Sequence, residues 1–358
     1  MTEEKTHRML VVGDMVMSAE RQVPWLVKAL IDSFDAHCVV GNSEIPLTER
    51  GTPAAKFVAW RTEPSVAQQI RRLGFDIVSI ANNHAIDYGR EGLEDTLAAF
   101  QNAGIRTVGA GKDLDAALSP AVVTFDATTK VAIIGVACTL PLGSIADVNH
   151  PGIAPIRVST RYEFDPMDLQ EEPGCQPTYI HTQAHVADIE RLGQRIGTWK
   201  QKGYLVIVSI HWGNAFQKQL AQYQRPLAHA FQQAGCDLVI GHHPHTIHGI
   251  EVINRMPVLY SLGNFIMDEK IVGHADSSLP EGLATPWIMS PEALVGVLEF
   301  RSGKLTSLRI RPILLDDHGF PTRVEGTLGE KFLREVETYP PGPAGWEFTK
   351  GSALIRLG

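Results

Sequence analysis

Four histidines lie close together in the segment VIGHHPHTIHG, residues 239–249, directly after a short apolar run. They are His242, His243, His245 and His248. Imidazole nitrogens bind divalent metals and carry protons near neutral pH, so the segment predicts a metal site, a proton-transfer site or both. A polar loop without chemistry is the alternative, and it is the better interpretation for any one histidine considered alone.

Other polar residues follow short apolar runs in the same way. MLVV (9–12) leads to Asp14, CVV (38–40) to Glu44, DIVSI (76–80) to Asn83 and His84, and LVIVSI (205–210) to His211. In sheets of parallel strands, ligands bind beyond the carboxyl ends of the strands. Five strand ends that each offer a carboxylate, an amide or an imidazole therefore predict one convergent site.

The side chains at these strand ends form a plausible set of metal ligands. We expect Asp14 and Glu44 to supply negative charge, Asn83 a neutral carbonyl oxygen, and His211 and His243 imidazole nitrogens. Oxygen and imidazole donors suit Ca, Mn, Mg or Zn, and the sequence does not distinguish these ions. The prediction is one divalent metal ion and no organic cofactor.

A second group of residues is suited to proton transfer. In the run NNHAID, Asp87 follows His84 by three residues. A carboxylate that accepts a hydrogen bond from one ring nitrogen raises the basicity of the other, so the pair could act as a general base or acid. The alternative is that Asp87 caps the helix after Gly89. We assign His84, Asp87 and His245 to catalysis, with His245 at the edge of the metal site.

The apolar runs alternate with helical patterns, which predicts an α/β fold whose strands are buried on both faces. Predicted helices cover 24–34, 91–102, 184–202 and 220–234, another ends at Leu73, and Gly104 suits a helix end. Further strands are expected at 106–108, 121–125, 131–137, 237–240, 257–262, 294–300 and 305–314. We expect one domain over 1–358, with lid or recognition insertions at about 139–180 and 267–292 and a C-terminal extension from about 315.

Seven motifs resemble, in order and spacing, the CapA/PgsA capsule-synthesis family over about residues 8–268. They are GDMVMS, GNSEIPLTERGTP, IVSIANNHAIDYGREGLEDTL, GIRTVGAG, SIHWGN, GHHPHTIHGIE and VLYSLGNFI. The resemblance implies a calcineurin-like metallophosphoesterase fold with layered sheets flanked by helices. It implies that the family's site positions fall on Asp14, Glu44, Asn83, His84, His211, His243 and His245.

Within the matching motifs, the choice of ligand between His242 and His243 stays open, with His243 preferred. We expect His242, Trp212 and Asn264 to contact the substrate. Two departures from dinuclear phosphoesterases matter. Val16 stands where their first motif, Asp-x-His, has a histidine, and Glu44 stands where they have aspartate. Both departures favour one metal over a two-metal clamp for phosphoryl transfer.

The resemblance extends to soluble enzymes of peptide natural-product biosynthesis, including a metal-dependent epimerase that acts on the C-terminal residue of a lasso-peptide precursor. The first hypothesis is therefore a metal-dependent acid/base enzyme that epimerises a Cα atom of a peptide. The alternatives are a metal-dependent hydrolase of a phosphoester or of a γ-glutamyl or peptide bond in polyglutamate metabolism, and a binding module without catalysis.

Composition excludes several other classes. The net charge is −8, from 32 basic and 40 acidic residues, and no basic stripe marks a nucleic-acid binder. No apolar run approaches the ~18–20 residues that span a bilayer. The four cysteines form no Cys-x-x-Cys pair, so a thiolate metal site is not expected. We therefore expect a cytoplasmic protein that acts on a peptide without nucleic-acid or membrane partners.

Overall fold

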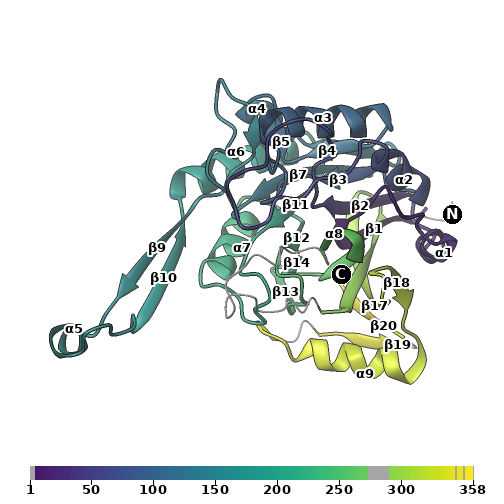
Figure 1. Cartoon of the computed structure of the whole chain (residues 1–358). Helices are drawn as coiled ribbons and strands as arrows, with labels where there is room; N and C mark the ends of the chain where they lie inside the picture. Colours follow the sequence, from purple (N-terminus) through teal and green to yellow (C-terminus); the bar gives the residue numbers. More distant parts are fainter. Residues whose placement is uncertain (1–4, 273–289, 343–344, 350, 358) are drawn as a thin grey trace.

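Two sheets packed face to face make up the centre of the computed structural model, which describes residues 5–272, 290–342, 345–349 and 351–357 (Figure 1). In the larger sheet the strand order is β19 (Glu347–Thr349), β20 (Ser352–Arg356), β17 (Lys304–Leu315), β16 (Glu292–Arg301), β1 (His7–Val16), β2 (Cys38–Ser43), β3 (Ile77–Ser79) and β4 (Arg106–Val108). β15 (Asn264–Met267) also pairs with β1, and β18 (Pro321–Arg323) pairs with β17.

The smaller sheet has six strands and carries the histidine-rich segment. Its order is β13 (Ile250–Ile253), β14 (Met256–Leu259), β12 (Leu238–His242), β11 (Leu205–His211), β7 (Lys130–Ala137) and β6 (Ala121–Thr124). β11 is parallel to both of its neighbours, so its carboxyl end and that of β12 lie at the same edge.

Alternating side chains explain why the strands are continuously apolar. On β1, Met9 and Val11 face the other sheet, whereas Leu10 and Val12 pack under helices. A strand covered on both faces must be apolar at every position, as the sequence predicts. The result is four layers, helix, sheet, sheet and helix, which confirms the predicted layered α/β class.

Helices cover the outer face of each sheet. The larger sheet is covered by α1 (Trp25–Asp32), α2 (Val66–Leu73) and α3 (Gly89–Asn102), and the smaller by α6 (Val186–Gln201) and α7 (Gln224–Gln233). The remaining helices are α4 (Leu114–Ala117), α5 (Pro166–Glu171), α8 (Glu269–Val272) and α9 (Gly326–Glu337). Gly104 has φ +72 just after α3, which fits its predicted place at the helix end.

The start of α7 corrects the sequence prediction. The helix was expected from Leu220 but begins at Gln224. The side chain of Gln224 accepts a hydrogen bond from the backbone N–H of Ala221 at 2.7 Å, and the hydroxyl of Tyr223 accepts one from Gly213 at 2.7 Å. These bonds shape a loop where helical spacing alone predicts another turn of helix.

The predicted insertion at 139–180 forms, in part, an arm that leaves the body of the protein. β9 (Val158–Glu163) and β10 (Tyr179–Ala184) pair only with each other, and α5 lies at the tip (Figure 1). The short pair β5 (Ala110–Gly111) and β8 (Gly152–Ile153) lies nearer the body. Most of the other predicted insertion, 267–292, lies outside the described residues.

The chain beyond residue 315 adds β18, α9, β19 and β20, and three of these are strands of the larger sheet. In the described ranges, none of the helices is both long and apolar enough to cross a membrane.

Candidate metal centre

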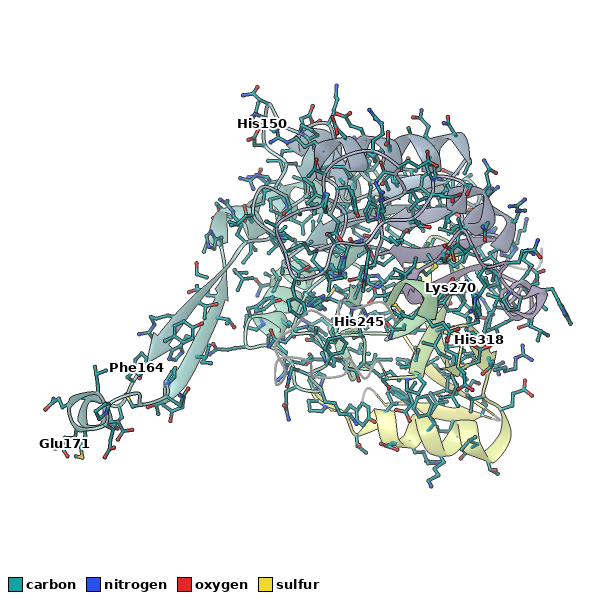
Figure 2. All side chains as sticks on the ribbon, in the orientation of Figure 1. His150, Phe164, Glu171, His245, Lys270 and His318 are labelled. Carbon is teal, nitrogen blue, oxygen red and sulfur yellow. The ribbon has the colours of Figure 1, made fainter. Side chains whose placement is uncertain are left out.

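The polar residues predicted at strand ends meet at one edge of the two sheets. Asp14 lies in β1 and Glu44 directly follows β2, both from the larger sheet. His211 and His242 end the neighbouring strands β11 and β12 of the smaller sheet and pair with each other in register. Residues from both sheets therefore surround a common buried space. His245, labelled in Figure 2, marks its place in the molecule.

Glu44 is the clearest sign that this space is suited to a cation. Its side chain is fully buried, and neither carboxylate oxygen has a hydrogen-bond partner. Its Oε1 lies 3.2 Å from Nε2 of His211 and 3.7 Å from Nε2 of His245. Burial raises the pKa of Glu44 well above its usual value. Buried carboxylates are almost always paired, so a bound cation is the partner that this site needs.

Asp14 is fully buried as well, but protein groups already hold it. Asn42 donates to its Oδ1 at 2.8 Å, and the backbone N–H of His243 donates to its Oδ2 at 3.1 Å. Nδ1 of His242 lies 3.3 Å from the same Oδ1. Burial opposes ionisation, yet the contact with His242 and the nearby imidazoles hold the pKa of Asp14 below its usual range. Asp14 is therefore an anion ready to bind metal.

Two groups of three side chains have the spacing of metal ligands. One is Asp14, Glu44 and His211, and the other is Glu44, His243 and His245. Within each group the ligand atoms lie within 4.8 Å of one another, and Glu44 belongs to both. Carboxylate oxygens with imidazole nitrogens suit Mn, Zn or Fe, and the oxygens alone suit Mg or Ca. One ion or two ions bridged by Glu44 fit this arrangement, so the single ion stays a prediction.

Asn83 lies beside the first group. Its Oδ1 is 2.7 Å from Nε2 of His211, where the imidazole N–H donates to the amide oxygen. An ion bound by His211 through Nε2 would replace this proton and meet the amide oxygen of Asn83 nearby. Burial lowers the pKa of His211 well below its usual value, so the ring is neutral and able to bind metal.

The backbone of the histidine segment is strained at the site. His243 has φ +97 and His245 has φ +53, on either side of Pro244. A residue other than glycine in this left-handed region costs about 1–3 kcal/mol, and such strain persists where the surroundings impose it. Here the N–H of His243 is bound to Asp14, and the carbonyl of Pro244 accepts from Phe216 at 2.8 Å. These bonds turn both rings toward Glu44.

Asn264 sets the orientation of His245. Its Oδ1 lies 2.9 Å from Nδ1 of His245, so the imidazole donates through Nδ1 and presents Nε2 toward Glu44. Burial lowers the pKa of His245, but the charges of Glu44 and Asp14 outweigh it, and the pKa is raised. The residue expected at the metal's edge therefore lies in the second ligand group.

His84 and Asp87 form the predicted pair. Nδ1 of His84 lies 2.7 Å from Oδ2 of Asp87, and the imidazole stacks on Trp60 with ring centroids 4.2 Å apart. Tyr88, not Asp87, is the N-cap residue of α3, and no side chain caps that helix, so the capping alternative is wrong. Burial lowers the pKa of His84 against the opposing effect of Asp87, which keeps the ring neutral.

Lys56 completes this pair and was not expected from the sequence. Its ammonium donates to Asp87 at 2.6 Å and to the backbone carbonyl of Asn83 at 2.8 Å. It also lies 3.4 Å from Nδ1 of His84. The segment around Lys56 has no helical or strand periodicity, so no local signal identified this residue. The contact of Asn42 with Asp14 was not predicted for a different reason, because in the sequence Asn42 looks like another residue of its strand.

The three predicted substrate contacts have partners inside the protein, and their contact with a substrate stays a prediction. Trp212 is fully buried, stacks on Tyr260 and donates its indole N–H to the carbonyl of Tyr260 at 2.9 Å. Asn264 is fully buried and bonded to His245, which it positions. His242 is also buried and faces Asp14, and it stands outside both ligand groups, whereas His243 belongs to one.

His248 is fully buried, and its Nε2 donates to the carbonyl of Gln217 at 2.7 Å, which gives it a structural role.

Beside the cluster lies a polar pocket of about 520 Å³. Trp60 contributes to its wall while stacking on His84, so the pocket adjoins the His84 side of the site.

Comparison with known proteins matches these residues to a described family. The family model for the bacterial capsule synthesis protein PGA_cap matches residues 9–269. The PGA biosynthesis protein CapA of Bacillus subtilis is 32% identical over 244 residues, which are 67% of this chain and 56% of that protein. The capsule biosynthesis protein CapA of Bacillus anthracis is 26% identical over 77% of this chain and 64% of its own length.

A probable polyglutamine synthesis accessory protein of Mycobacterium tuberculosis is 30% identical over 309 residues, 85% of this chain and 73% of that protein. The chain thus covers less than two thirds of the length of the two CapA proteins.

Proposed function

The chain belongs to the bacterial capsule synthesis family PGA_cap, and from that premise we propose that it is a metal-dependent acid/base enzyme that epimerises a Cα atom of a peptide. The family has the calcineurin-like metallophosphoesterase fold, with which the layered sheets agree. The peptide substrate and the epimerase reaction go beyond what the family relationship establishes and are the content of the proposal.

One observation carries the proposal: a neutral imidazole is held beside the metal ligands without being one of them. His84 is fixed by Asp87 and Trp60, and its Nδ1 is occupied by the carboxylate. It is close enough to His211 and His243 for their charges to influence one another's pKa. With Nδ1 engaged, Nε2 is the basic atom that can take a proton from a substrate.

Epimerisation needs two proton carriers on opposite faces of the Cα atom. In the proposed reaction Nε2 of His84 takes the α-proton, the Cα–H bond breaks, and its electron pair delocalises into the neighbouring carbonyl. His245, the second assigned carrier, returns a proton to the other face and restores the Cα–H bond with inverted configuration. A divalent ion held by Asp14, Glu44 and His211 would supply positive charge for a substrate carboxylate or carbonyl oxygen.

His245 is available for this role only when one ion is bound. With a single ion held by Asp14, Glu44 and His211, the two imidazoles of the second ligand group, His243 and His245, would stay free. With two ions, His245 is a ligand and cannot transfer protons. The number of bound ions therefore separates epimerisation from hydrolysis.

A hydrolase is the second candidate, and the sharing of Glu44 by both ligand groups favours it. Two ions bridged by one carboxylate form the usual clamp that activates water for attack. Relatives named for PGA biosynthesis and polyglutamine synthesis make a γ-glutamyl or peptide bond the more relevant target than a phosphoester.

One set of incubations tests both candidates. Peptides with varied C-terminal residues and a γ-glutamyl oligomer are incubated with the metal-loaded enzyme in D2O, and α-deuterium and released amine are measured by mass spectrometry. Epimerisation predicts α-deuterium without cleavage and about one bound ion per chain. Cleavage without exchange, with two ions per chain, would instead establish the hydrolase.

The role of His84 has a matched control in the same chain. His84→Gln should keep its metal and lose about 10²–10⁴-fold in rate, which is the usual contribution of an acid/base group. His150 pairs with Asp147 at 2.7 Å with the same three-residue spacing, but on the surface. His150→Gln should therefore leave the rate unchanged. Equal losses in both variants would remove the basis of the proposal.

A further inference from the structure

The arm formed by β9, β10 and α5 extends from the body without cover from the described part of the chain (Figure 1). None of the residues of α5 is buried. Figure 2 shows Phe164 and Glu171 on this arm, far from the rest of the protein. A two-stranded ribbon alone is only marginally stable in water, so a surface that covers the arm would stabilise it.

The two faces of the arm differ in character. Ile180 pairs with Tyr162 across the ribbon, and Phe164, one residue beyond β9, continues the same alternation. These side chains are 57%, 58% and 36% exposed, respectively. The opposite face is more polar, with Arg161 paired with His181 and Glu163 paired with Tyr179. An alternating pattern with an apolar face is typical of a strand that is covered on one side.

The tip of the arm is apolar and acidic. On α5, Met167 and Leu169 are 69% and 63% exposed. Four carboxylates surround them and form no ion pair within the described part of the chain. They are Asp165, Asp168, Glu171 and Glu172.

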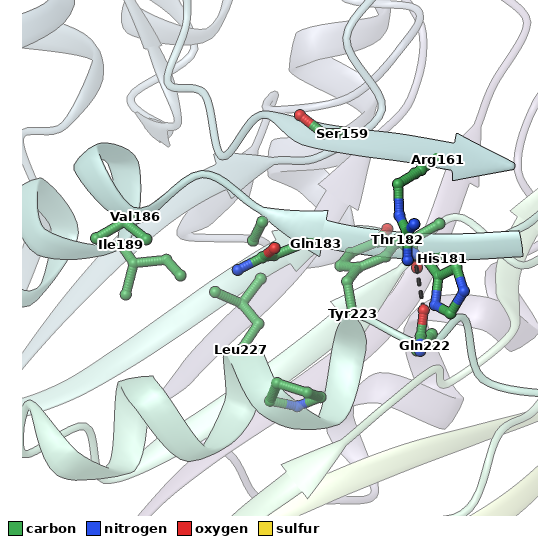
Figure 3. A pocket seen from close by; sticks show the side chains of 12 residues that line it. Ser159, Arg161, His181, Thr182, Gln183, Val186, Ile189, Gln222, Tyr223 and Leu227 are labelled. Atoms are coloured by element: carbon green, nitrogen blue, oxygen red, sulfur yellow. Dashed lines mark hydrogen bonds between the residues drawn. The ribbon is translucent and has the colours of Figure 1, made fainter. Parts of the chain in front are cut away.

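The base of the arm has the complementary character. A pocket of about 650 Å³ lies there, between the arm and α7, with Val186, Ile189 and Leu227 among its apolar lining (Figure 3). Asp188 lies between the pocket residues Val186 and Ile189 in the chain. Arg157 and Arg191 share its carboxylate, each at 2.7 Å, and both guanidinium groups stay partly exposed.

We propose that two copies of this chain associate through their arms, which run in opposite directions so that each α5 tip occupies the pocket at the base of the other arm. A two-fold axis requires a surface that is complementary to itself. The arm meets this requirement because it carries both the apolar, acidic tip and the apolar, basic base.

The area is sufficient for such a dimer. Five apolar side chains of the arm are 36–69% exposed. With about 150–250 Å² for a full aromatic side chain and somewhat less for an aliphatic one, their exposed parts amount to on the order of 500 Å² per arm. Two arms and the linings of two pockets therefore approach the ~1,200–2,000 Å² that stable interfaces bury. The proposal is independent of the chemistry at the metal centre.

Sedimentation equilibrium on the full chain tests the proposal. The wild-type chain should be a dimer at micromolar concentration. The double variant Met167→Ser, Leu169→Ser should dissociate with a Kd on the order of 10–100-fold higher, as expected for two interface side chains. Neither side chain is buried in one copy, so its fold should persist. The control Leu26→Ser, Leu328→Ser changes two similarly exposed leucines on α1 and α9 and should leave the Kd unchanged.

A cross-link tests the direction of the arms. Cys175 follows α5 near the tip, and Val186 lines the pocket at the base. A short bismaleimide should join two copies of the Val186→Cys variant and should give far less dimer when Cys175 is also changed to Ser. A wild-type chain that is monomeric throughout the micromolar range would overturn the proposal. An unchanged Kd in the Met167→Ser, Leu169→Ser variant would overturn it as well.

Discussion

Replacing Glu44 with glutamine should stabilise the metal-free protein and destabilise the metal-loaded one. Both carboxylate oxygens of Glu44 are buried without a hydrogen-bond partner. An unsatisfied buried polar group costs about 1–3 kcal/mol, and more when it is charged. Without metal, Glu44→Gln should therefore raise the free energy of unfolding by about 1–3 kcal/mol at neutral pH.

The stability difference between Glu44→Gln and the wild type should depend on pH in a direction set by the pKa of Glu44. Burial raises the pKa of Glu44 in the folded state above its ordinary value of 4.5. A group of this kind contributes most to stability below its unfolded pKa, and that contribution is lost as the pH rises toward the folded pKa. The advantage of Glu44→Gln should thus be small near pH 4.5 and grow as the pH rises.

Bound metal should make the wild type more stable than Glu44→Gln, the reverse of the order without metal. An ion at about 100 times its Kd adds about 2.7 kcal/mol to the wild-type stability. The variant, which lacks the carboxylate shared by both ligand groups, should gain little. Urea unfolding from pH 5 to 8, with EDTA or with Mn²⁺, measures all four states, and elemental analysis gives the metal content.

Glu251 provides a control of opposite sign. Burial would raise its pKa, but hydrogen bonds from Arg225 at 2.6 Å and Tyr260 at 2.8 Å lower it. Glu251→Gln should therefore destabilise the protein at neutral pH, by less as the pH falls. If Glu44→Gln were destabilising in EDTA at pH 8, as Glu251→Gln should be, the case for a cation at Glu44 would fail.

Three further predictions follow from the hydrogen bonds around the site. Asn264→Leu should lower the rate about 10–100-fold with the single bound ion retained, because Asn264 holds His245, the second proton carrier, through its Nδ1. An unchanged rate, or loss of the ion in a metal titration, would contradict this prediction. Lys56→Met should lower kcat and leave the metal content unchanged, because the ammonium of Lys56 holds Asp87. Elemental analysis and rate measurements on one preparation test this prediction. A loss of metal in parallel with the loss of rate would count against it. Trp212→Phe should lower the free energy of unfolding by about 1–3 kcal/mol, because the carbonyl of Tyr260 loses its hydrogen-bond donor. The KM should stay unaltered. A raised KM would support the predicted contact between Trp212 and the substrate.

The sequence identified the convergent strand ends because their signal is local. A continuous apolar run predicts a strand buried on both faces, and the first polar residue after it marks the open edge of the sheet. Asp14, Glu44 and His211 followed from this rule alone. The same rule could not decide between His243 and His242 as the ligand. That choice depends on the positive φ of His243, which turns its ring toward Glu44, whereas the ring of His242 lies against Asp14.

The partners that Trp212, Asn264 and Lys56 have inside the protein depend on contacts between distant parts of the chain. Trp212 and Asn264 lie in the same motifs as ligands, and spacing does not say whether a side chain meets a substrate or another part of the protein. Lys56 reaches Asp87 across 31 positions from a segment without periodicity. The arm was expected only as an insertion, since its apolar face is unusual in lacking cover within the described chain.

The division of the ligands between two sheets has a consequence for folding. Asp14 and His243 meet across 229 positions of the chain, so closing this contact is among the slower steps that topology imposes. An ion can meet its full set of ligands only after both sheets have formed and docked. Bound metal should therefore slow unfolding while leaving early folding rates unchanged.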